Sequence, residues 1–588
     1  MNSDADAGWF SAFNIMKDNY GLTDDAIGVF AINLRFNLDD IQTIAAESIT
    51  GGGDDKKCDV LYVDKERRIA VIAQCYVSQK LRQSAPSNKA SDLNTAISWL
   101  LSADIDQLPA SLKGKADELR SAISSGDVKQ LFIWYVHNAP SSKNVEDELR
   151  AVENSARVAL NRYETGRDIN IFAEEMCNKK IGHLYMQAER TVIVTDEFSL
   201  IVPDVVETIE TDWSSVVTNV NGEWLYNLYH QYGTDLFSAN LRGYLGSRDS
   251  DSNINNGIKK TANTQPNNFY VYNNGITALV LDFEIGRRSR SGRKLKITGI
   301  AIVNGAQTTG SIGNLDNKPS AGLKIPIRFV KANKDSIVAD VVRYNNLQNK
   351  LQAADFRSAD QIQERLRTEF EKIPDAEYEG GRRGGASDAI KRSKFTLPSY
   401  TVGQSLAAFH GNPVTAYDKK SELWTNDSNY RHIFTERTTA RHIVFCYSLL
   451  TSINDRRLDL TNMDKKDGNS LTKIQKTSLD FLNNKGANYL LLHVISQCME
   501  TILSKPIPNR FDLQFRQNVS PFAAVSLWKP IVDMMLSLSN QLEPAFSRNR
   551  ISNENVNKTV PNFVGVVASI KDLQQTTFND FASKVSVQ

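Results

Sequence analysis

The sequence predicts a multidomain protein of the α/β (α+β) class, and three observations support this prediction. At 588 residues the chain is too long for a single hydrophobic core, because domains usually contain about 100–200 residues. Short apolar runs typical of strands alternate with helical segments before residue 165, and strands dominate again between residues 269 and 330. After about residue 400 the apolar residues recur with the period of amphipathic helices.

The composition is that of a folded protein without a global charge. Hydrophobic residues make up 41% and charged residues 23% of the chain, so most of its length is expected to fold. Lys and Arg total 69 against 68 for Asp and Glu, which leaves too little net positive charge to hold nucleic acid nonspecifically. Any surface that binds nucleic acid must therefore be a local patch.

The cysteines and the N-terminus indicate a cytoplasmic protein. The five cysteines are scattered without CxxC or Cys/His ligand spacing, which argues against a zinc site and a disulfide framework. The sequence begins MNSDADAGWF, without the basic and apolar regions of a signal peptide. No apolar run reaches the roughly 18 residues of a membrane span, so we expect no membrane association.

The first predicted domain covers residues 1–165, in which helices and short strands alternate. Asp24 and Asp25 can cap an N-terminal helix, and the glycines of residues 48–55 break its pattern. The predicted strands are residues 59–63, 69–74 and 131–136, and the predicted helices on either side of the last strand are residues 91–101 and 145–163. Residues 166–221 are expected to connect this domain to the next.

The second predicted domain, residues 222–400, is strand-rich at its centre, and the third, residues 401–588, is helical. The expected strands lie in the runs FYVYNNGITALVLDFEI, KLKITGIAIV and KIPIRFV. Helices are expected at residues 335–344 and 360–371, a basic loop at 381–394, and amphipathic helices at 440–450, 489–503 and 521–542. We expect the last group, with Phe515 and Trp528, to form a core or an oligomer interface.

A candidate metal site lies where the first two predicted strands meet. Asp59 stands at the mouth of one strand, and Gln74 and Tyr76 stand at the end of the next. Phosphodiester hydrolysis with Mg²⁺ needs an acidic residue and a second oxygen ligand to hold the metal, and a lysine to orient water and offset negative charge. The residues alone also allow a structural interpretation without a metal site. In it Asp59 is a turn residue, and Gln74 is a hydrogen-bonded polar group at a strand end.

This segment resembles the PD-(D/E)xK nucleases in their Q-x-K form, with Asp59 and Gln74 at the acidic and glutamine positions. The resemblance implies Mg²⁺ or Mn²⁺ as the cofactor, and Asp55 as a further metal ligand. The sequence departs from the pattern at Tyr76, where the family has its lysine, and Lys80 is the candidate for a migrated catalytic lysine. The acid that a helix often adds to such sites has three candidates here, which are Asp24, Asp25 and Glu47.

Six motifs of the second domain follow one another in the order and approximate spacing of a known family. They are LFSANLRGYLG (236–246), INNGIKKT (254–261), FYVYNNGIT (269–277), IVNGAQTTGSI (302–312), IPIRFV (325–330) and YNNLQNKLQAADFRS (344–358). These motifs resemble the abortive infection phage resistance (AIPR) family of bacterial antiviral proteins, which often carry a nuclease-like domain in the N-terminal position. The resemblance implies a role in bacterial antiphage defence.

The motifs place amides, hydroxyls and glycines at the ends of apolar strands. The NNG of residues 273–275 suits a turn with positive φ, and residues 304–308 repeat that arrangement before a helix start, which is a natural position for an anion. For any single residue of these motifs, the alternative to ligand binding is a structural role, in which an asparagine caps a turn or an arginine pairs with an acid. The residues predicted to bind nucleic acid or a nucleotide are Arg242, Asn273, Asn274, Gly275, Asn304, Gly305, Gln307, Thr308, Arg328, Asn345, Asn346, Gln348 and Arg357.

One of these motifs has a second likeness. IVNGAQTT resembles the DGQQR-type sequence of ParB-related nucleotide-binding and nuclease proteins, and YNNLQNKL resembles the helix start that follows it there. Asn304 replaces the aspartate of that motif, and Thr308 replaces its arginine. The likeness implies a nucleotide or a nucleic-acid backbone as the ligand, and the sequence does not choose between them.

The sequence leads to two functional hypotheses from different classes. In the first, the chain is an antiphage effector that cuts DNA or RNA as a Mg²⁺-dependent endonuclease, and its second domain binds nucleic acid or a nucleotide. In the second, Tyr76 marks an inactive nuclease fold, and the chain is a binding or sensor module for a partner that performs the killing step. Either hypothesis is compatible with a homo-oligomer built by the C-terminal helices.

Overall fold

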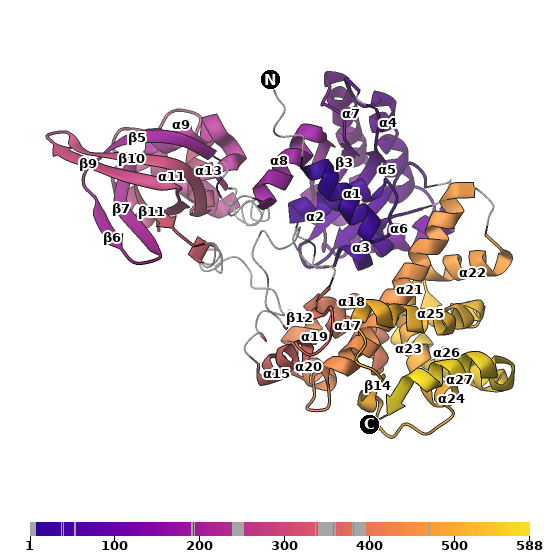
Figure 1. Ribbon diagram of the computed structural model, residues 1–588. Coiled ribbons are helices and arrows are strands. Elements are labelled where there is room, and N and C mark those ends of the chain that lie inside the picture. Colours follow the sequence, from indigo (N-terminus) through magenta and orange to yellow (C-terminus); the bar gives the residue numbers. More distant parts are fainter. Residues whose placement is uncertain are drawn as a thin grey trace.

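The protein is a mixed α+β molecule, with 56% of its residues in helices and 20% in strands, which confirms the predicted class. The computed structural model describes residues 8–587 apart from 37, 39, 52–54, 81, 190–191, 193, 238–251, 335–336, 339–340, 342–356, 358–359, 379, 381–394 and 468–470. Figure 1 shows an N-terminal sheet covered by helices, a central sheet that stands to one side, and a helical C-terminal region.

The N-terminal unit is built on a four-stranded sheet in the order β1-β2-β3-β4. Strand β1 is antiparallel to β2, whereas β2, β3 and β4 run parallel. The parallel strands therefore end at one edge of the sheet, which is where ligands bind in open α/β sheets. The strands are β1 (Val60–Asp64), β2 (Ile69–Tyr76), β3 (Gln130–His137) and β4 (Asn170–Met176).

Helices cover both faces of this sheet, and apolar side chains on both sides of β1, β2 and β3 are buried. One face packs against α1 (Trp9–Asn19), α2 (Ala26–Phe36), α3 (Ile41–Ser48) and α8 (Asn178–Glu189). The other face packs against α4 (Ser87–Ser91), α5 (Leu93–Leu101), α6 (Ala110–Ser124) and α7 (Lys143–Leu160). Gly28 of α2 lets this helix lie close to the sheet, since a Cβ there would stand 2.8 Å from Cys75 Sγ.

The central unit is a seven-stranded sheet in the order β5-β10-β8-β11-β7-β6, with β9 paired to β10. Its pairs are antiparallel except for β8 and β11, which run parallel. The strands are β5 (Val194–Val202), β6 (Val206–Ile209), β7 (Trp213–Asn221), β8 (Ile276–Leu279), β9 (Asp282–Ser289), β10 (Gly292–Asn304) and β11 (Lys324–Ala332). Its described helices include α9 (Gly222–Tyr232), α11 (Ser252–Thr264), α12 (Phe269–Tyr272) and α13 (Ala306–Gly313).

The C-terminal region is a helical body with one large apolar core, in which Phe515 and Trp528 are buried as the sequence predicts. Its described helices are α15 (Gln361–Phe370), α17 (Ser399–Phe409), α18 (Pro413–Asp418), α19 (Glu422–Thr425), α20 (Asp427–Ile433), α21 (Ala440–Asp467), α22 (Lys473–Leu482), α23 (Ala487–Gln497), α24 (Met499–Leu503), α25 (Pro521–Ser537), α26 (Asn553–Ser569) and α27 (Gln575–Lys584). Three short strand pairs accompany them, formed by β12 (Glu377–Tyr378), β13 (Thr396–Leu397), β14 (Leu513–Phe515), β15 (Phe546–Ser547), β16 (Arg550–Ile551) and β17 (Val585–Val587).

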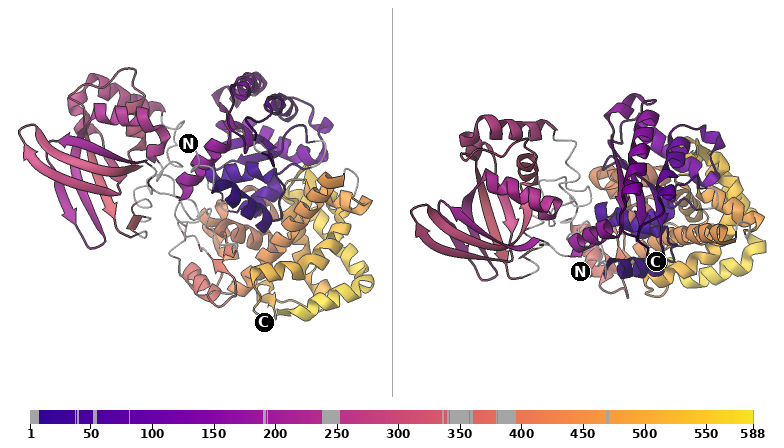
Figure 2. Two further views of the ribbon diagram at one scale, coloured as in Figure 1. Left: turned by 45° about the horizontal axis from the view of Figure 1, so that its top comes forward. Right: turned by 90° about the horizontal axis from the view of Figure 1, so that it is seen from above.

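The N-terminal unit and the helical region lie side by side in all views (Figures 1 and 2), and polar contacts join them. Lys485 forms an ion pair of 2.6 Å with Glu118 of α6, and Arg550 forms one of 3.3 Å with Asp117. On the other side of this contact, Thr401 Oγ1 donates to Asp40 over 2.8 Å. The two ends of the chain therefore form one joint body, whereas the central sheet projects away from it.

Two segments differ from the sequence-based expectation. Residues 166–221, expected to connect two domains, instead supply β4 to the N-terminal sheet and β5, β6 and β7 to the central sheet. Glu174 and Glu175 interrupt the apolar run of β4, and β6 is exposed along its whole length, so these strands lack the buried pattern that reveals a strand. Residues 269–272, expected to start a strand, form α12.

Other expectations fall on residues that are only partly described. The predicted basic loop at 381–394 and most of the predicted helix at 335–344 lie outside the described residues. Within the described part of the chain, no single helix has both the length and the apolar character needed to cross a membrane. Helix α25 and the 3-10 helix that follows it, Ser539–Ala545, pass that test together, but the pair is bent by 70°.

Candidate functional site

Asp59 and Gln74 meet at the edge of the N-terminal sheet. Asp59 directly precedes β1, and the register of Val60 with Ala73 brings it opposite Gln74 on β2. Its Oδ2 atom accepts hydrogen bonds from Gln74 Nε2 over 2.5 Å and from the backbone N–H of Cys75 over 2.6 Å. Both side chains are almost fully buried. The structure thus brings together the two residues that the sequence singles out.

A row of polar groups continues from this pair across the sheet. Gln74 stands beside Tyr135 of β3, and Tyr135 stands beside Glu175 of β4. The buried atoms Gln74 Oε1 and Tyr135 Oη have no hydrogen-bond partner among the described residues. Leaving such an atom unpaired costs about 1–3 kcal/mol, so two neighbouring unpaired atoms suggest a site that takes a ligand or water.

The charge on Asp59 is held in an unfavourable environment. Burial and, next to it, the carboxylate of Asp25 raise the pKa of Asp59 to about 8. The carboxylate of Asp55 raises this pKa further, whereas the Cys75 N–H and the ammonium group of Lys465 lower it. A cation bound at this place would relieve the repulsion between the carboxylates.

Asp25 is the helix acid whose charge acts on Asp59. It directly precedes α2, and it forms an ion pair with Lys465 at the end of α21. Asp24 instead forms an ion pair of 2.9 Å with Lys17. Glu47 accepts a hydrogen bond of 3.3 Å from Asn488 of α23. Of the three helix acids that the sequence offers, only Asp25 ranks among the main influences on the pKa of Asp59.

The turn before Asp59 has a constrained backbone. Lys56 and Lys57 both adopt positive φ, at 52° and 67°, which is uncommon for residues other than glycine. Asp55 stabilises the turn, because its Oδ1 accepts from the Lys57 N–H over 2.8 Å. Asp55 is half-buried and stands beside the site. Strained turns of this kind are common where a side chain must be held for function.

Strand β2 does not supply the lysine of the nuclease pattern. Tyr76 occupies the strand end, and the guanidinium group of Arg82 lies 5.8 Å from the centre of its ring. Lys80 is exposed in the following turn, where its backbone N–H donates to Ser78 Oγ over 3.3 Å. The interactions described for Lys80 are thus limited to its own turn.

The residues at this site fit an oxygen-ligated divalent cation. Asp59 and Asp25 supply carboxylates, and Gln74 Oε1 is a buried oxygen without a partner among the described residues. Mg²⁺ prefers such oxygens and keeps several waters, so it needs only a few protein ligands. No group of three His, Cys, Asp or Glu side chains in the described part of the chain is arranged for a metal. The fit therefore depends on the amide oxygen of Gln74.

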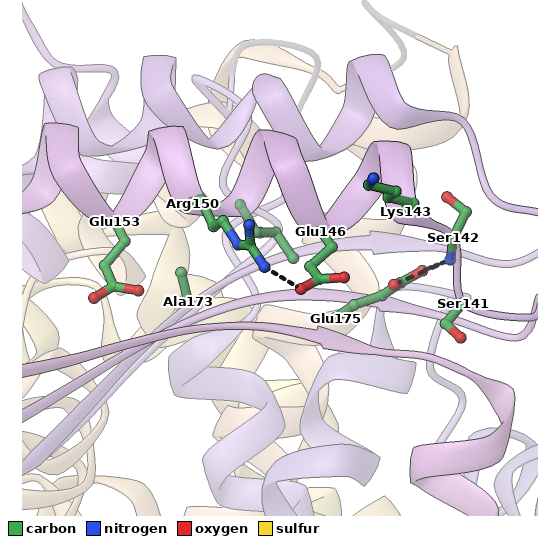
Figure 3. Close-up of a pocket in the computed structure, with 9 residues that line it drawn as sticks. Ser141, Ser142, Lys143, Glu146, Arg150, Glu153, Ala173 and Glu175 are labelled. Carbon is green, nitrogen blue, oxygen red and sulfur yellow. Dashed lines mark hydrogen bonds and ion pairs between the residues drawn. The ribbon is translucent and has the colours of Figure 1, made fainter.

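The polar row ends at an open pocket at the start of α7, shown in Figure 3. Glu175 links the polar row to this pocket, because its Oε1 lies 3.0 Å from His137 Nε2 and its carboxylate accepts a hydrogen bond of 3.3 Å from the Ser142 N–H. The pocket has a volume of about 580 Å³ and is lined mainly by charged and polar side chains. Arg150 and Glu146 form an ion pair of 2.6 Å within it.

The NNG and NGAQTT motifs meet at one end of the central sheet. Asn273 Oδ1 accepts hydrogen bonds of 3.1 Å from the Gly275 N–H and from Thr308 Oγ1. Gly275 and Gly305 have positive φ, and a Cβ on Gly305 would stand 2.9 Å from the Gly275 carbonyl oxygen. Only glycine allows this approach of the two backbones. We call this group, residues 273–275 and 304–308, the amide cluster.

The remaining predicted binding residues are distributed differently. Arg328 lies beside the amide cluster, where its Nη2 donates to Thr277 Oγ1 over 3.1 Å. Arg357 lies instead on the helical region, where it donates to the Trp424 carbonyl over 2.9 Å and forms an ion pair with Asp427. The predicted positions that lie outside the described residues are Arg242, Asn345, Asn346 and Gln348.

An exposed apolar surface borders the amide cluster and was not anticipated from the sequence. Tyr270, Val271 and Tyr272 are 46%, 72% and 64% exposed. The helical conformation of α12 turns these side chains outward, whereas the expected strand would have buried alternate residues. Exposed tyrosines beside amides are typical of surfaces on which nucleic-acid bases stack.

Comparison with known proteins identifies the family. A family model described as AIPR protein matches residues 237–530, which is half of the chain. The chain therefore belongs to the AIPR family, and this membership gives it a role in abortive infection and phage defence. No curated protein and no solved structure matches it. The matched region includes the amide cluster and most of α21 to α25, but it does not include Asp59 and Gln74.

Proposed function

We propose that the chain is a metal-dependent phosphodiesterase that cuts DNA or RNA in phage defence, and that its reaction takes place beside Asp59. The single observation that carries this proposal is the buried pair of Asp59 and Gln74 at the strand edge, where the charge of half-buried Asp25 acts on Asp59. This group combines repelling carboxylates with an amide oxygen that has no partner among the described residues. A purely structural group would be expected to satisfy its polar atoms.

The cofactor in this proposal is Mg²⁺ or Mn²⁺, held by Asp59, Asp25 and the Oε1 atom of Gln74, with Asp55 beside them. When bound, such an ion stabilises the negative charge of a phosphate under attack. The Cys75 N–H fixes the orientation of the Asp59 carboxylate through a 2.6 Å hydrogen bond. Gln74 Nε2 donates to the same carboxylate oxygen, and a half-turn of the amide group would direct Oε1 instead of Nε2 toward a cation beside Asp59.

The proposal gives the amide cluster the role of binding nucleic acid or a nucleotide. Asn274 and Arg328 are exposed there, and both present groups that donate hydrogen bonds to phosphate. The tyrosines of α12 offer stacking faces next to them. Binding of labelled single-stranded DNA and RNA to the full chain tests this role, with Asn274→Ala expected to weaken binding without loss of thermal stability.

Cleavage tests the reaction directly. The full chain is incubated with plasmid DNA and with total RNA, each with Mg²⁺, Mn²⁺ or EDTA. Asp59→Ala is expected to lower metal-dependent cleavage about 100-fold or more, because it removes the central carboxylate. Asp106→Ala is the matched control, since Asp106 lies in the same unit and its side chain is 87% exposed. Cleavage that persists unchanged in Asp59→Ala would remove this site from consideration.

A second function is favoured by one observation, the tyrosine at position 76. Without a lysine on β2, the N-terminal unit would be an inactive nuclease fold, and the chain would be a binding or sensor module for a partner that performs the killing step. Thermal denaturation with and without Mn²⁺ separates the two functions. If the nuclease fold is inactive, we expect no cleavage with any metal, added nucleotide or phage lysate. We also expect Mn²⁺ to leave the melting temperature unchanged.

The proposal also includes a cytoplasmic location and a homo-oligomer. All five cysteines are free and buried, which suits a reducing compartment. In the helical region, Ile474, Phe522 and Leu573 are large apolar side chains that are 60%, 66% and 83% exposed. Sedimentation velocity of the purified chain tests the oligomer, and a single species with the mass of one chain would rule it out.

A further inference from the structure

Helix α21 of the C-terminal region reaches the N-terminal site with its last turn. Lys465 is ion-paired through its Nζ atom with Asp25, although the two residues are 440 positions apart. One turn earlier, Asn462 Nδ2 donates to the Gly21 carbonyl over 3.0 Å. The side chains of Lys465 and Asp25 are 17% and 26% exposed, so this is the more open side of a site in which Asp59 is buried.

The loop that leads to Asp59 is shaped around this end of α21. Gly51 has φ of +60°, and a Cβ there would stand 2.2 Å from Thr461 Cγ2 and 3.7 Å from Lys465 Cε. Any other residue at this position would push the loop away from the helix. Next to Gly51, the backbone N–H of Thr50 donates to the Asp59 carbonyl over 3.1 Å, so the segment that contacts α21 is also bonded to Asp59.

The charges around Asp59 show why a cation is needed there. The carboxylates of Asp25 and Asp55 both act on Asp59, and each raises its pKa. Two other nearby lysines have partners elsewhere, since Lys57 pairs with Asp92 at 3.5 Å and Lys115 donates to the Ile49 carbonyl over 2.8 Å. The ion pair of Lys465 ends on Asp25, whose charge acts on Asp59.

We infer that Lys465 is the cation of the N-terminal site. From α21 it takes the role of the lysine that the nuclease pattern has at position 76, so that α21 and the N-terminal sheet form one composite site. This inference rests on the proposed function. An ammonium group beside the carboxylates offsets their repulsion of an anionic phosphate and holds Asp25 in position. Lys465 lies within the region that matches the AIPR family, whereas Asp59 lies outside it. The family region thus completes a site that begins in another part of the chain.

The experiment compares the full-length wild-type chain with Lys465→Met, Lys465→Arg and a control, Arg456→Met. Arg456 lies on the same helix, and its ion pair with Asp533 of α25, at 2.7 Å, does not involve the site. Two quantities are measured, which are metal-dependent cleavage of nucleic acid and the rise in melting temperature that Mn²⁺ produces. The second does not require activity.

The inference predicts different responses of the two quantities. Lys465→Met is expected to lower cleavage about 100-fold, and to enlarge the effect of Mn²⁺ on melting, because the metal no longer competes with an ammonium group for Asp25. Lys465→Arg is expected to recover part of the cleavage. Arg456→Met is expected to match wild type in both quantities after correction for its own melting temperature in EDTA.

Each other outcome overturns the inference in a recognisable way. If Lys465→Met cleaves as well as wild type, Lys465 has no part in the site and the proposed function stands alone. If Lys465→Met loses cleavage and the Mn²⁺ effect together, the role of Lys465 is only structural. If wild type binds Mn²⁺ without cleaving, a smaller or unchanged Mn²⁺ effect in Lys465→Met rejects the inference. A wild-type chain that neither cleaves nor responds to Mn²⁺ overturns the proposed function and the inference together.

Discussion

The Asp59 site and the amide cluster are both polar groups at the end of a sheet, yet they are built in opposite ways. The Asp59 site is buried, charged and incompletely hydrogen-bonded, with Gln74 Oε1 and Tyr135 Oη unpaired among the described residues. In the amide cluster Asn273 is satisfied by Gly275 and Thr308. Under the proposed function, the first arrangement gives up stability for chemistry, whereas the second uses polar groups to fix a backbone beside exposed residues that would bind a ligand.

The largest effect is expected from the acid that completes the charged site. Asp25→Asn removes one of the carboxylates that repel Asp59, and it also removes the partner of Lys465. We expect metal-dependent cleavage to fall about 100-fold or more. Asp24→Asn is the matched control, because Asp24 pairs with Lys17 instead. Equal loss in both variants would show that the effect comes from the N-terminal end of α2 and not from the site.

The second prediction concerns the helical region that holds α21. His442 is fully buried, with Nδ1 at 2.8 Å from the Leu513 carbonyl and Nε2 at 2.9 Å from His410 Nε2. Burial lowers the pKa of His442 to about 4 from its ordinary 6.5, so the folded state disfavours the charged ring. The stability contributed by the neutral ring is present above pH 6.5 and is lost as the pH falls toward 4.

This loss amounts to about 3 kcal/mol, since each pKa unit corresponds to about 1.4 kcal/mol. Urea denaturation at pH 7.5 and pH 4.5 measures it, with His442→Gln as the comparison. The difference in unfolding free energy between the two pH values is expected to be smaller in the variant than in wild type. The same difference in both proteins would contradict the account of His442.

The third prediction separates function from stability at Asp59. Asp59→Asn keeps the size of the side chain but removes a buried acid whose pKa is raised by burial and by Asp25. We expect the free energy of unfolding in EDTA to rise by about 1 kcal/mol, while metal-dependent cleavage is lost. Chemical denaturation followed by circular dichroism measures the change. A destabilised variant would mean that the Asp59 charge supports the fold.

The smallest predicted effect has the opposite sign and lies in the amide cluster. Thr308→Val removes the hydroxyl that donates to Asn273 over 3.1 Å, in a position that is almost fully buried. We expect the free energy of unfolding to fall by about 1 kcal/mol. The same denaturation experiment measures it, with Thr208→Val on the exposed strand β6 as a control for the loss of a hydroxyl. A stabilised Thr308→Val would erase the contrast between the two regions.

The parts of this structure that the sequence predicts are those set by local pattern. Asp59 and Gln74 meet because a hairpin joins β1 and β2, and hairpin register follows from short-range spacing. The turn at Gly275 and the helix start after Gly305 follow from the conformations open to glycine. The helical core around Trp528 follows from the period of its apolar residues.

The parts that the sequence does not predict depend on contacts between distant segments. Lys465 joins the Asp59 site from α21, and no spacing in the chain indicates that contact. The choice of Asp25 over Asp24 depends on the direction in which each side chain leaves the turn before α2. Strand β4 escapes pattern analysis because two consecutive glutamates, Glu174 and Glu175, interrupt the apolar pattern on both faces of this edge strand.

The central claim is that the N-terminal sheet edge holds a divalent cation, and an anomalous diffraction experiment on crystals of the full chain grown with Mn²⁺ tests it most directly. The account predicts an anomalous peak within about 2.0–2.6 Å of an Asp59 carboxylate oxygen and of Gln74 Oε1, the range of oxygen ligands to divalent cations. The peak is expected to be absent from crystals of Asp59→Ala. Ordered density for Asp59, Asp25 and Gln74 without any anomalous peak between them would contradict the claim.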